Sequence, residues 1–236
     1  MWPFARKYAL QPSGYFRDWT DWHCHILPGV DDGIRTMDDA LKVLSFYADI
    51  GIRDVWLTPH IMEDIPNSPA ELRARFAELL AVYRGPLQLH LAAEHMLDNL
   101  FEERFASGDV LPIGPGGDTL LVETSYFNPP MDMDGTLRRI HREGLRPLLA
   151  HPERYVYMDM RDYRRLHSEG IRFQLNLLSL TGHYGPAARR KALLLLKEGF
   201  YDRSGTDLHR LPSFKDAIMD KCLTKSQLNL LSSLRT

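Results

Sequence analysis

The sequence predicts an α/β fold in which about seven strand–helix units form a closed or nearly closed barrel of parallel strands. Three observations lead to this prediction. Short apolar runs recur along the 236-residue chain, amphipathic segments separate them, and glycines follow the amphipathic segments. Parallel strands covered on both faces are apolar in this way. Regular β-to-α alternation over such a length favours a barrel over an open sheet.

The expected strands are apolar runs rich in strand-forming residues. In chain order they fall at residues 20–25, 54–60, 87–95, 119–126, 146–151, 172–178 and 201–205. The five middle runs stand out by composition, and the first and last complete the set of seven units. Because the runs alternate with helical segments, we expect neighbouring strands to be parallel.

Five amphipathic segments suit helices that cover the strands. They span residues 37–50, 70–83, 134–143, 161–169 and 186–198. Thr36 can cap the first, because Asp39 lies three positions further on. Each segment is followed by a glycine, which favours a helix-to-strand return: Gly51, Gly85, Gly144, Gly170 and Gly199. With no linker or repeat to divide the chain, residues 20–236 are expected to form a single domain.

Composition argues against several classes of protein. A formal net charge of −2 argues against a nucleic-acid partner, since such partners require a basic surplus. Cys24 and Cys222 are too few and too far apart for a disulfide framework, which favours the cytoplasm. No run reaches the roughly 20 apolar residues of a transmembrane segment.

Residues 1–19 form a leader before the first expected strand. Trp2 and Phe4 are apolar, but Arg6 and Lys7 interrupt any run long enough for a signal peptide. Packing beneath the barrel is the simplest role for the leader. A partner surface and a membrane-touching anchor stay open as alternatives.

Metal-ligand residue types gather where the expected strands end, and active sites lie at that end of a β/α barrel. Nine of them are candidate ligands: His23, His25, Asp32, His60, Glu94, Glu123, His151, Asp207 and His209. His23 and His25 are two residues apart, so both rings face the same side of an extended strand. Asp207 and His209 repeat this spacing. One such pair is a weak signal, but two at one rim reinforce each other.

Each candidate also has a purely structural interpretation. Glu94 and Glu123 follow apolar runs, where a buried carboxylate needs an ion pair, hydrogen bonds or a metal. His60 and His151 adjoin prolines and can serve as caps. The remaining histidines have similar explanations and are left unassigned: His90, His95, His141, His167 and His183.

Imidazole and carboxylate ligands without thiolate suit Mn, Fe or Zn. Nine candidates exceed the needs of one ion, which implies two or three ions. Ions about 3.5 to 4 Å apart are a standard device for attack on phosphorus. The residues themselves therefore predict a metal-dependent phosphoester hydrolase.

Five motifs carry a resemblance to a known family. They are DWHCHILPGVDDG at 21–33, TPH at 58–60, AEHML at 93–97, LAHPERY at 149–155 and GTDLH at 205–209. Together they resemble the polymerase and histidinol phosphatase (PHP) superfamily. Within it, they are similar to bacterial manganese-dependent protein-tyrosine phosphatases of capsule and exopolysaccharide operons. The departures are a longer leader and Thr206 in place of the more usual serine.

The resemblance implies a distorted (β/α)7 TIM-like barrel, the PHP fold, with three ions. By position, the first ion would be held by His23, His25, Glu94 and Asp207, the second by Glu94, Glu123 and His151, and the third by Asp32, His60 and His209. Glu94 would thus bridge two ions. The catalytic residues would be Arg154, Glu94 and His209, with Arg154 clamping the phosphate through its planar guanidinium.

The implied substrate is the phosphotyrosine tail of a bacterial tyrosine kinase that controls capsular or exopolysaccharide synthesis. Aromatic residues near the strand ends can bracket a phenyl ring or simply pack their loops: Tyr126, Phe127, Tyr155, Tyr157 and Tyr184. A cysteine phosphatase is disfavoured, because its Cys-x5-Arg signature would need arginine where Val30 and Leu228 stand.

Two other functions stay open at the level of sequence. One is a small-molecule phosphatase such as one for histidinol phosphate, which needs a carboxylate for the substrate's ammonium group. Glu153 and Asp159 are among the few acids to spare for that purpose. The other is a metal-binding regulatory module without turnover. The sequence does not specify an oligomeric state.

Overall fold

The computed structural model describes residues 6–234, which form a mixed α/β fold. A three-stranded sheet has the order β1 (Trp19–Cys24), β2 (Ile52–Leu57), β4 (Gln88–Leu91). A six-stranded sheet has the order β3 (His60–Ile61), β5 (Glu94–Met96), β6 (Thr119–Glu123), β7 (Arg146–Ala150), β8 (Arg172–Asn176), β9 (Tyr201–Gly205). All neighbouring strands within these sheets are parallel, as expected.

Two interrupted strands divide the structure into its two sheets. β2 and β3 are separated by Thr58 and Pro59, and β4 and β5 by Ala92 and Ala93. Pro59 has no N–H group to donate to a ladder, so a break there is expected. The first halves extend the sheet of β1, and the second halves extend the sheet of β6. When each interrupted strand is counted once, the strands of the described residues occupy seven positions.

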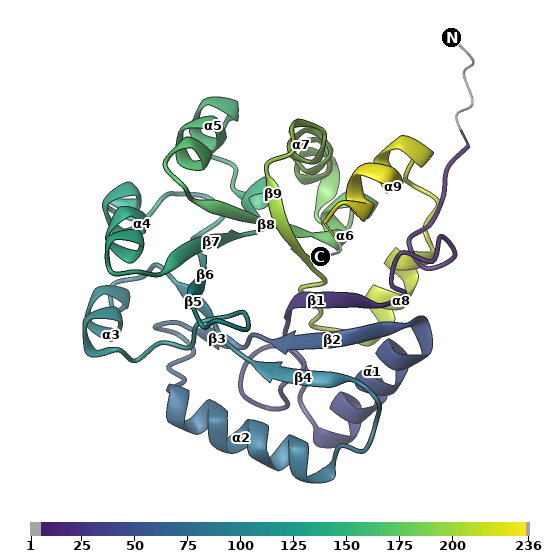
Figure 1. The fold of residues 1–236 in the computed structure, drawn as a ribbon, viewed down its shortest axis with the longest axis horizontal. Coiled ribbons are helices and arrows are strands. Elements are labelled where there is room, and N and C mark those ends of the chain that lie inside the picture. Colours follow the sequence, from purple (N-terminus) through teal and green to yellow (C-terminus); the bar gives the residue numbers. More distant parts are fainter. Residues whose placement is uncertain (1–5, 235–236) are drawn as a thin grey trace.

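The last strand lies beside the first. Just past β9, the amide of Asp207 donates to the carbonyl oxygen of His23 (2.7 Å), and the amide of His25 donates to that of Leu208 (3.0 Å). The strands therefore surround a common centre, as Figure 1 shows. The result is a distorted, barrel-like arrangement in which the two chain segments richest in candidate ligands meet.

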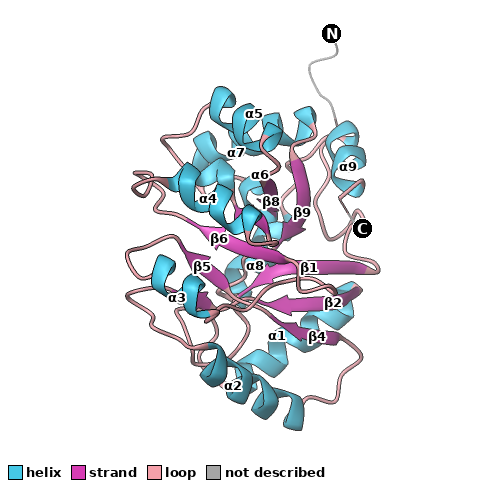
Figure 2. Ribbon diagram, turned by 60° about the vertical axis from the view of Figure 1, so that its left-hand side comes forward, coloured by secondary structure: helices cyan, strands magenta, loops and turns pink. Residues whose placement is uncertain are grey.

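Helices flank the strands on the outside, with α1 and α2 near β2 and β4, and α4, α5 and α7 near the other sheet (Figure 2). The helices of the described residues are α1 (Met37–Ile50), α2 (Pro69–Val82), α3 (Phe101–Ser107), α4 (Met133–Arg142), α5 (Met160–Ser168), α6 (Leu177–Thr181), α7 (Gly185–Glu198), α8 (Leu211–Met219) and α9 (Lys225–Ser232), with a 3-10 turn η1 (Pro152–Arg154).

All five predicted helices are confirmed, with ends within one residue of those expected. The amide of Asp39 donates to the Thr36 hydroxyl (3.2 Å), and Gly51 ends α1 with a φ of 95°. The sequence pattern does not predict α3, α6, α8 or α9. α3 and α6 are short, with seven and five residues, and so give little periodic signal.

Several predicted strands are wrong in extent. Residues 54–60 and 87–95 each form two short strands rather than one. The strand expected over 119–126 ends at Glu123, and the one expected over 172–178 ends at Asn176. There the Asn176 side chain accepts a hydrogen bond from the amide of Leu178 (2.9 Å) and starts α6. An apolar run gives no sign of such a local cap, which explains the error.

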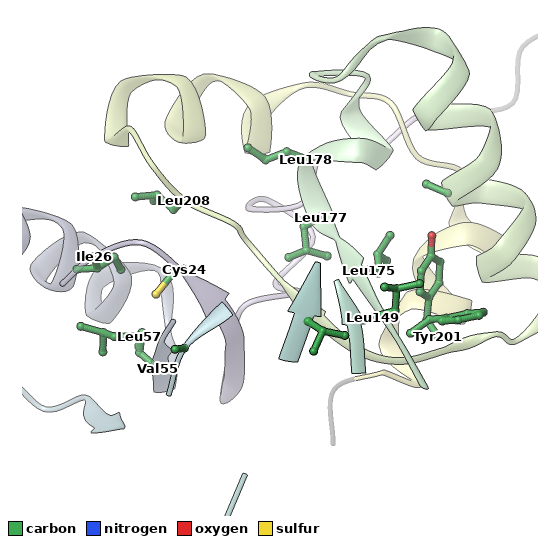
Figure 3. Packing of buried hydrophobic residues seen from close by; sticks show 14 of the residues in the cluster. Cys24, Ile26, Val55, Leu57, Leu149, Leu175, Leu177, Leu178, Tyr201 and Leu208 are labelled. Carbon is green, nitrogen blue, oxygen red and sulfur yellow. The ribbon is translucent and has the colours of Figure 1, made fainter. Parts of the chain in front are cut away.

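The apolar core has two parts. Figure 3 shows Cys24, Ile26 and Leu57 lying close together in the larger part. The smaller cluster consists of Trp22, Trp56, Ala92, Ile113, Leu121, Leu148 and Ala150. Leu121 and Glu123 stand two residues apart on β6 and point to the same side. The smaller cluster therefore supports the carboxyl ends of the strands with apolar side chains from below.

The described part of the leader packs against the C-terminal segment. Tyr8 forms an antiparallel bridge with Leu223, through a bond from the Tyr8 amide to the Leu223 carbonyl oxygen (2.8 Å). The buried ring of Phe16 lies 6.1 Å from that of Phe214. Packing is thus the role seen for residues 6–18, while Trp2 and Phe4 lie outside the described residues. Within residues 6–234, no helix has the length and apolarity needed to cross a membrane.

Candidate metal centre

The structure brings all nine candidate ligands together at the carboxyl ends of the strands. His23 belongs to β1, and His60, Glu94 and Glu123 belong to β3, β5 and β6. His151 directly follows β7. The other four lie in the loops after β1 and β9: His25, Asp32, Asp207 and His209. Parallel strands place these ends at one rim, which is why residues up to 186 positions apart in the sequence, His23 to His209, converge.

A first group of four side chains is fully enclosed. The Nε2 atoms of His23 and His25 lie 3.1 Å apart. The Glu94 Oε2 atom is 3.1 Å from His23 Nε2, and the Asp207 Oδ1 atom is 3.3 Å from His25 Nε2. These ligand atoms all lie within 4.8 Å of one another. They are the same four residues that the family resemblance assigns to one ion.

A second group surrounds the other side of Glu94. Its Oε1 atom lies 2.9 Å from His151 Nε2, while Glu123 Oε1 lies 3.0 Å from His60 Nδ1. The two carboxylate oxygens of Glu94 thus face different partners. Glu123 is less close to His151, at 3.8 Å, than to His60. The geometry therefore brings His60 into this group, in addition to the three residues expected.

A third group lies toward solvent. Asp32 Oδ1 is 3.3 Å from His209 Nε2 and 3.5 Å from His60 Nε2. His25 joins these residues, and all four ligand atoms lie within 4.8 Å of one another. Asp32 is the most accessible member, with 68% of its side chain exposed, so this group opens to the cavity.

Unsatisfied polar atoms indicate that the groups suit metal ions. Within residues 6–234, Glu94 Oε2 and His60 Nδ1 are buried without a hydrogen-bond partner. Yet Glu94 Oε2 lies 3.2 Å from His60 Nδ1, so the atoms are close but wrongly oriented for bonding. A buried polar atom without a partner costs about 1–3 kcal/mol. A cation at the point where these lone pairs converge would satisfy them, and the donor set matches Mn, Fe or Zn.

Opposite charges shift pKa values throughout the cluster. Burial disfavours the imidazolium form of His23, but Glu94 and Asp207 outweigh it and raise its pKa to about 9. Burial also disfavours the carboxylate forms of Glu94 and Asp207, yet the surrounding histidines lower the pKa of both well below the usual value. This concentration of negative charge attracts cations, whether protons or divalent metals.

Contacts at the Nδ1 atoms of His23 and His25 orient both rings so that their Nε2 atoms face the cluster. His23 Nδ1 lies 3.0 Å from Gln174 Oε1, and His25 Nδ1 lies 2.8 Å from Asp31 Oδ2. Such contacts fix the tautomer and ring orientation of ligating histidines. The sequence did not predict a supporting role for either residue. Asp31 carried a signal, as the neighbour of a candidate ligand, whereas Gln174 lies in an apolar run that gives none.

Two candidate ligands lie in strained backbone. His151 has a φ of 34° and Asp207 a φ of 52°, in the left-handed region that residues other than glycine rarely adopt. Both residues follow strands at the rim, where the chain turns sharply. Strain of this kind persists where surrounding contacts enforce it and is concentrated at functional sites.

Arg154 lies at the edge of the cluster, in the turn η1. Its Nη1 atom donates to Asp207 Oδ2 (2.8 Å). Its guanidinium carbon lies 4.1 Å from the ring centre of Tyr126 and 4.0 Å from that of Tyr184. The guanidinium is therefore held between two aromatic faces and one carboxylate. Sequence reasoning grouped these tyrosines with the rim but did not predict that they hold Arg154.

A cavity of about 480 Å³ opens above the cluster. Its lining includes His60, Glu94, Arg154 and Asp207 together with Tyr126 and Tyr184. Its size is typical of a small-ligand site. A phosphorylated side chain therefore has room to reach both Arg154 and the candidate ligands.

Of the two roles open to the rim aromatics, Tyr155 and Tyr157 take loop packing, whereas the expectation that Glu153 is a spare acid at the rim is wrong. Tyr155 is fully buried and its hydroxyl donates to the Ala150 carbonyl oxygen (2.8 Å), so it cannot bracket a substrate ring. Tyr157 lies 2.5 Å from the Thr124 hydroxyl and packs its loop. Glu153 is not at the rim either, because its buried carboxylate accepts hydrogen bonds from the Asn176 amide and the Tyr201 hydroxyl.

The two cysteines and the unassigned histidines lie outside the cluster, except that His183 lines the cavity. Cys24 is buried in the apolar core, and burial raises the pKa of its thiol well above the usual value. Cys24 is therefore a poor nucleophile. Burial lowers the pKa of His95 to about 4, so this ring is neutral and serves as a hydrogen-bonded core residue.

Comparison with solved structures supports this fold. A chain from a study of YwqE from Bacillus subtilis and CpsB from Streptococcus pneumoniae, described there as metal-dependent tyrosine phosphatases, superposes with a TM-score of 0.77. It is 23% identical, and the alignment covers 91% of each chain. An inactive dihydroorotase-like domain from Chaetomium thermophilum also shares the fold, with a TM-score of 0.51 and 12% identity over 81% of this chain and 64% of that chain. The α/β fold with parallel strands, expected from the sequence, is thereby confirmed.

Curated relatives are similar over most of their length. Tyrosine-protein phosphatase YwqE of Bacillus subtilis is 26% identical over 199 residues, covering 81% of this chain and 77% of that protein. Putative tyrosine-protein phosphatase CapC of Staphylococcus aureus is 23% identical, with the same coverage of both chains. The family model described as capsular polysaccharide synthesis, CpsB/CapC, matches residues 19–229, which include every candidate ligand. This chain therefore belongs to the CpsB/CapC family of capsular polysaccharide synthesis proteins.

Proposed function

We propose that residues 20–236 form one catalytic domain, a metal-dependent tyrosine-protein phosphatase that acts in the cytoplasm. Its substrate would be the phosphotyrosine tail of a bacterial tyrosine kinase that controls capsular or exopolysaccharide synthesis. The observation that carries this proposal is the placement of Arg154 beside nine converging metal-ligand side chains. The names of the relatives support the same activity.

The proposal gives three ligand groups to two or three ions of Mn, Fe or Zn. His23, His25, Glu94 and Asp207 form one group, Glu94, Glu123 and His151 with His60 a second, and Asp32, His60 and His209 with His25 a third. When bound, such ions polarise phosphoryl oxygens and lower the pKa of water. Glu94 has the central place, because each of its oxygens faces a different group.

The chain's own residues bind and orient the phosphate. Arg154 uses one Nη1 contact on Asp207, which leaves other N–H groups to hold phosphate oxygens. Tyr126 and Tyr184 restrict the guanidinium, so little side-chain entropy is lost when phosphate binds. The leaving tyrosinate has a conjugate-acid pKa of about 10, so the site needs no strong general acid.

The charges in the cavity favour an aryl phosphate over an amine-bearing one. Asp31 contacts His25 at 2.8 Å, and Asp32 contacts His209 at 3.3 Å. Asp207 is held by Arg154. Every carboxylate among the described residues of this lining thus has a cationic or ligand partner. The ammonium group of histidinol phosphate would find no spare acid there.

A steady-state comparison tests the proposal. A phosphotyrosine peptide, the same peptide with phosphoserine, and histidinol phosphate are each hydrolysed with added Mn and with excess chelator. We expect a clear kcat/KM preference for phosphotyrosine and loss of all turnover with the chelator. Arg154→Lys keeps the charge but loses the planar fork, so KM should rise. Arg164→Lys, on the exposed face of α5, is the matched control and should behave as wild type.

Two outcomes would reject the proposal. Equal or faster turnover of histidinol phosphate would indicate the small-molecule phosphatase. Stoichiometric metal without hydrolysis of any of the three substrates would indicate the regulatory module.

A further inference from the structure

Two arginines that the proposed reaction does not use lie at the mouth of the cavity. Arg35 follows the loop that carries Asp32, and Arg210 directly follows His209. Both side chains are exposed, and neither makes an ion pair or donates a hydrogen bond to any other residue within 6–234. Arg154, in contrast, is mostly buried, with 16% of its side chain exposed, and is already paired with Asp207.

The two arginines stand where two cavities meet. One is the cavity above the ligand cluster, and the other is a neighbouring cavity of about 670 Å³ between the loop after β1 and the start of α8. Arg35 and Arg210 line both, together with Ser213. The second cavity continues along the first turns of α1, past Asp39 and Lys42. A polypeptide whose phosphotyrosine enters the first cavity can therefore extend along the second.

The acidic groups of this second cavity are already compensated. Asp39 accepts from Lys42 Nζ (2.7 Å) and from the Thr36 hydroxyl (2.8 Å). Asp32 Oδ1 lies 3.3 Å from His209 Nε2 and 3.5 Å from His60 Nε2, so this carboxylate is engaged by the ligand cluster. Arg35 and Arg210 are therefore the uncompensated charges at this junction, and both are positive.

We infer that Arg35 and Arg210 form a second anion subsite, which binds an acidic group of the substrate polypeptide beside the phosphotyrosine. This inference rests on the proposed function and adds a sequence preference to it. The recognised group is a carboxylate of Asp or Glu, or the phosphate of a second phosphotyrosine. Guanidinium groups suit both, since their planar N–H donors match paired oxygens.

The test compares matched phosphotyrosine peptides. One has neutral flanking residues, two have glutamates on the N-terminal or the C-terminal side, and one has a second phosphotyrosine. kcat/KM is measured for wild type, Arg35→Gln, Arg210→Gln and the double variant. Each enzyme's ratio of acidic to neutral peptide is the readout, so any general change in activity cancels. Arg190→Gln on the exposed face of α7 is the control, since Arg190 lines neither cavity.

For the wild type, we expect kcat/KM to be roughly threefold to tenfold higher for one of the two glutamate peptides, the one whose acidic side reaches the subsite, than for the neutral peptide. The gain is of this size because partly exposed charge pairs contribute modestly. The ratio should approach one in the double variant and stay at the wild-type value in Arg190→Gln. Higher salt should reduce the preference through screening, mainly by raising KM. A larger gain from the second phosphotyrosine than from glutamate would identify phosphate as the preferred group.

Either of two results would overturn the subsite. Equal turnover of acidic and neutral peptides by the wild type would show that the enzyme does not recognise charged residues beside the phosphotyrosine. A preference that persists in the double variant would place its origin elsewhere. Both results leave phosphotyrosine hydrolysis intact, whereas failure to hydrolyse every phosphotyrosine peptide would reject the proposed function and the subsite together.

Discussion

Glu94 lies on a three-residue strand, and both of its carboxylate oxygens lie close to candidate ligands. Its Oε2 atom points to His23 and His60, and its Oε1 atom points to His151. The substitution Glu94→Gln keeps the shape of the side chain but removes the negative charge that the surrounding imidazoles compensate. The residue therefore offers a clean test of the cluster as a metal site.

We expect Glu94→Gln to lose bound metal and nearly all turnover. Loss of an outer partner of a metal ligand already costs about 10- to 100-fold, so loss of a shared ligand should cost more. Elemental analysis and kcat on a phosphotyrosine peptide measure the effect. Glu198→Gln, at the exposed end of α7, is the control. Full metal content and activity in Glu94→Gln would contradict this assignment.

Tyr184 contacts Arg154 through its ring and Asp207 through its hydroxyl, at 4.0 Å and 3.3 Å. Tyr184→Ala should raise KM by roughly two- to thirtyfold, since a cation–π contact contributes about 0.5–2 kcal/mol. Tyr184→Phe keeps the ring and should stay close to wild type. If the two variants were equally impaired, the hydroxyl rather than the stacked ring would be what matters.

The ligand residues were predictable because their types and spacings carry chemical information. His23 and His25 stand two residues apart where β1 ends, and such a pair is visible in sequence. The stack of Tyr126 and Tyr184 on Arg154 was not predictable, because it joins three loops far apart in the chain. Gln174 was equally hidden, since a single amide in an apolar run has many uses.

At the scale of elements, helices were easier to predict than strand ends. α1 carries a capping threonine, two acidic residues in its first turn and a terminal glycine, and these signals define its limits. The boundary between β8 and α6 depends on one side chain, Asn176, within a continuous apolar run. Periodicity alone cannot separate a buried strand from a buried helix over so few residues.

The leader behaves as a structural element in its described part. Phe16 is buried, with ring contacts to Trp19 at 5.5 Å and to Phe214 at 6.1 Å. Phe16→Ala should lower the free energy of unfolding by about 3–5 kcal/mol, the usual cost of removing a buried aromatic ring. Denaturant unfolding monitored by circular dichroism measures it.

Phe127→Ala is the matched control, because its side chain is 70% exposed and should contribute little to stability. Similar stability losses in both variants would contradict the packing role of the leader.

For the whole molecule, cluster charge and fold stability should be linked. Three of the buried groups at the centre are carboxylates, Glu94, Glu123 and Asp207, and cations that bind them in the folded state alone must stabilise it. We expect added Mn to raise the melting temperature and chelator to lower it, measured by calorimetry. Glu94→Gln should respond much less. An unchanged melting temperature in wild type would contradict a metal site in the core.

The pairing of Tyr8 with Leu223 and the meeting of His23 with Asp207 have a consequence for biosynthesis. On the ribosome, the first strand emerges long before its partner β9, at an elongation rate of about 5–20 residues per second. Until residues 204–214 have been translated, Trp19 lacks its hydrogen bond to Ser204, Phe16 lacks its contact with Phe214, and the first ligand group lacks Asp207. The metal binding proposed above would therefore come late in the maturation of each nascent chain, after residue 207 has been translated.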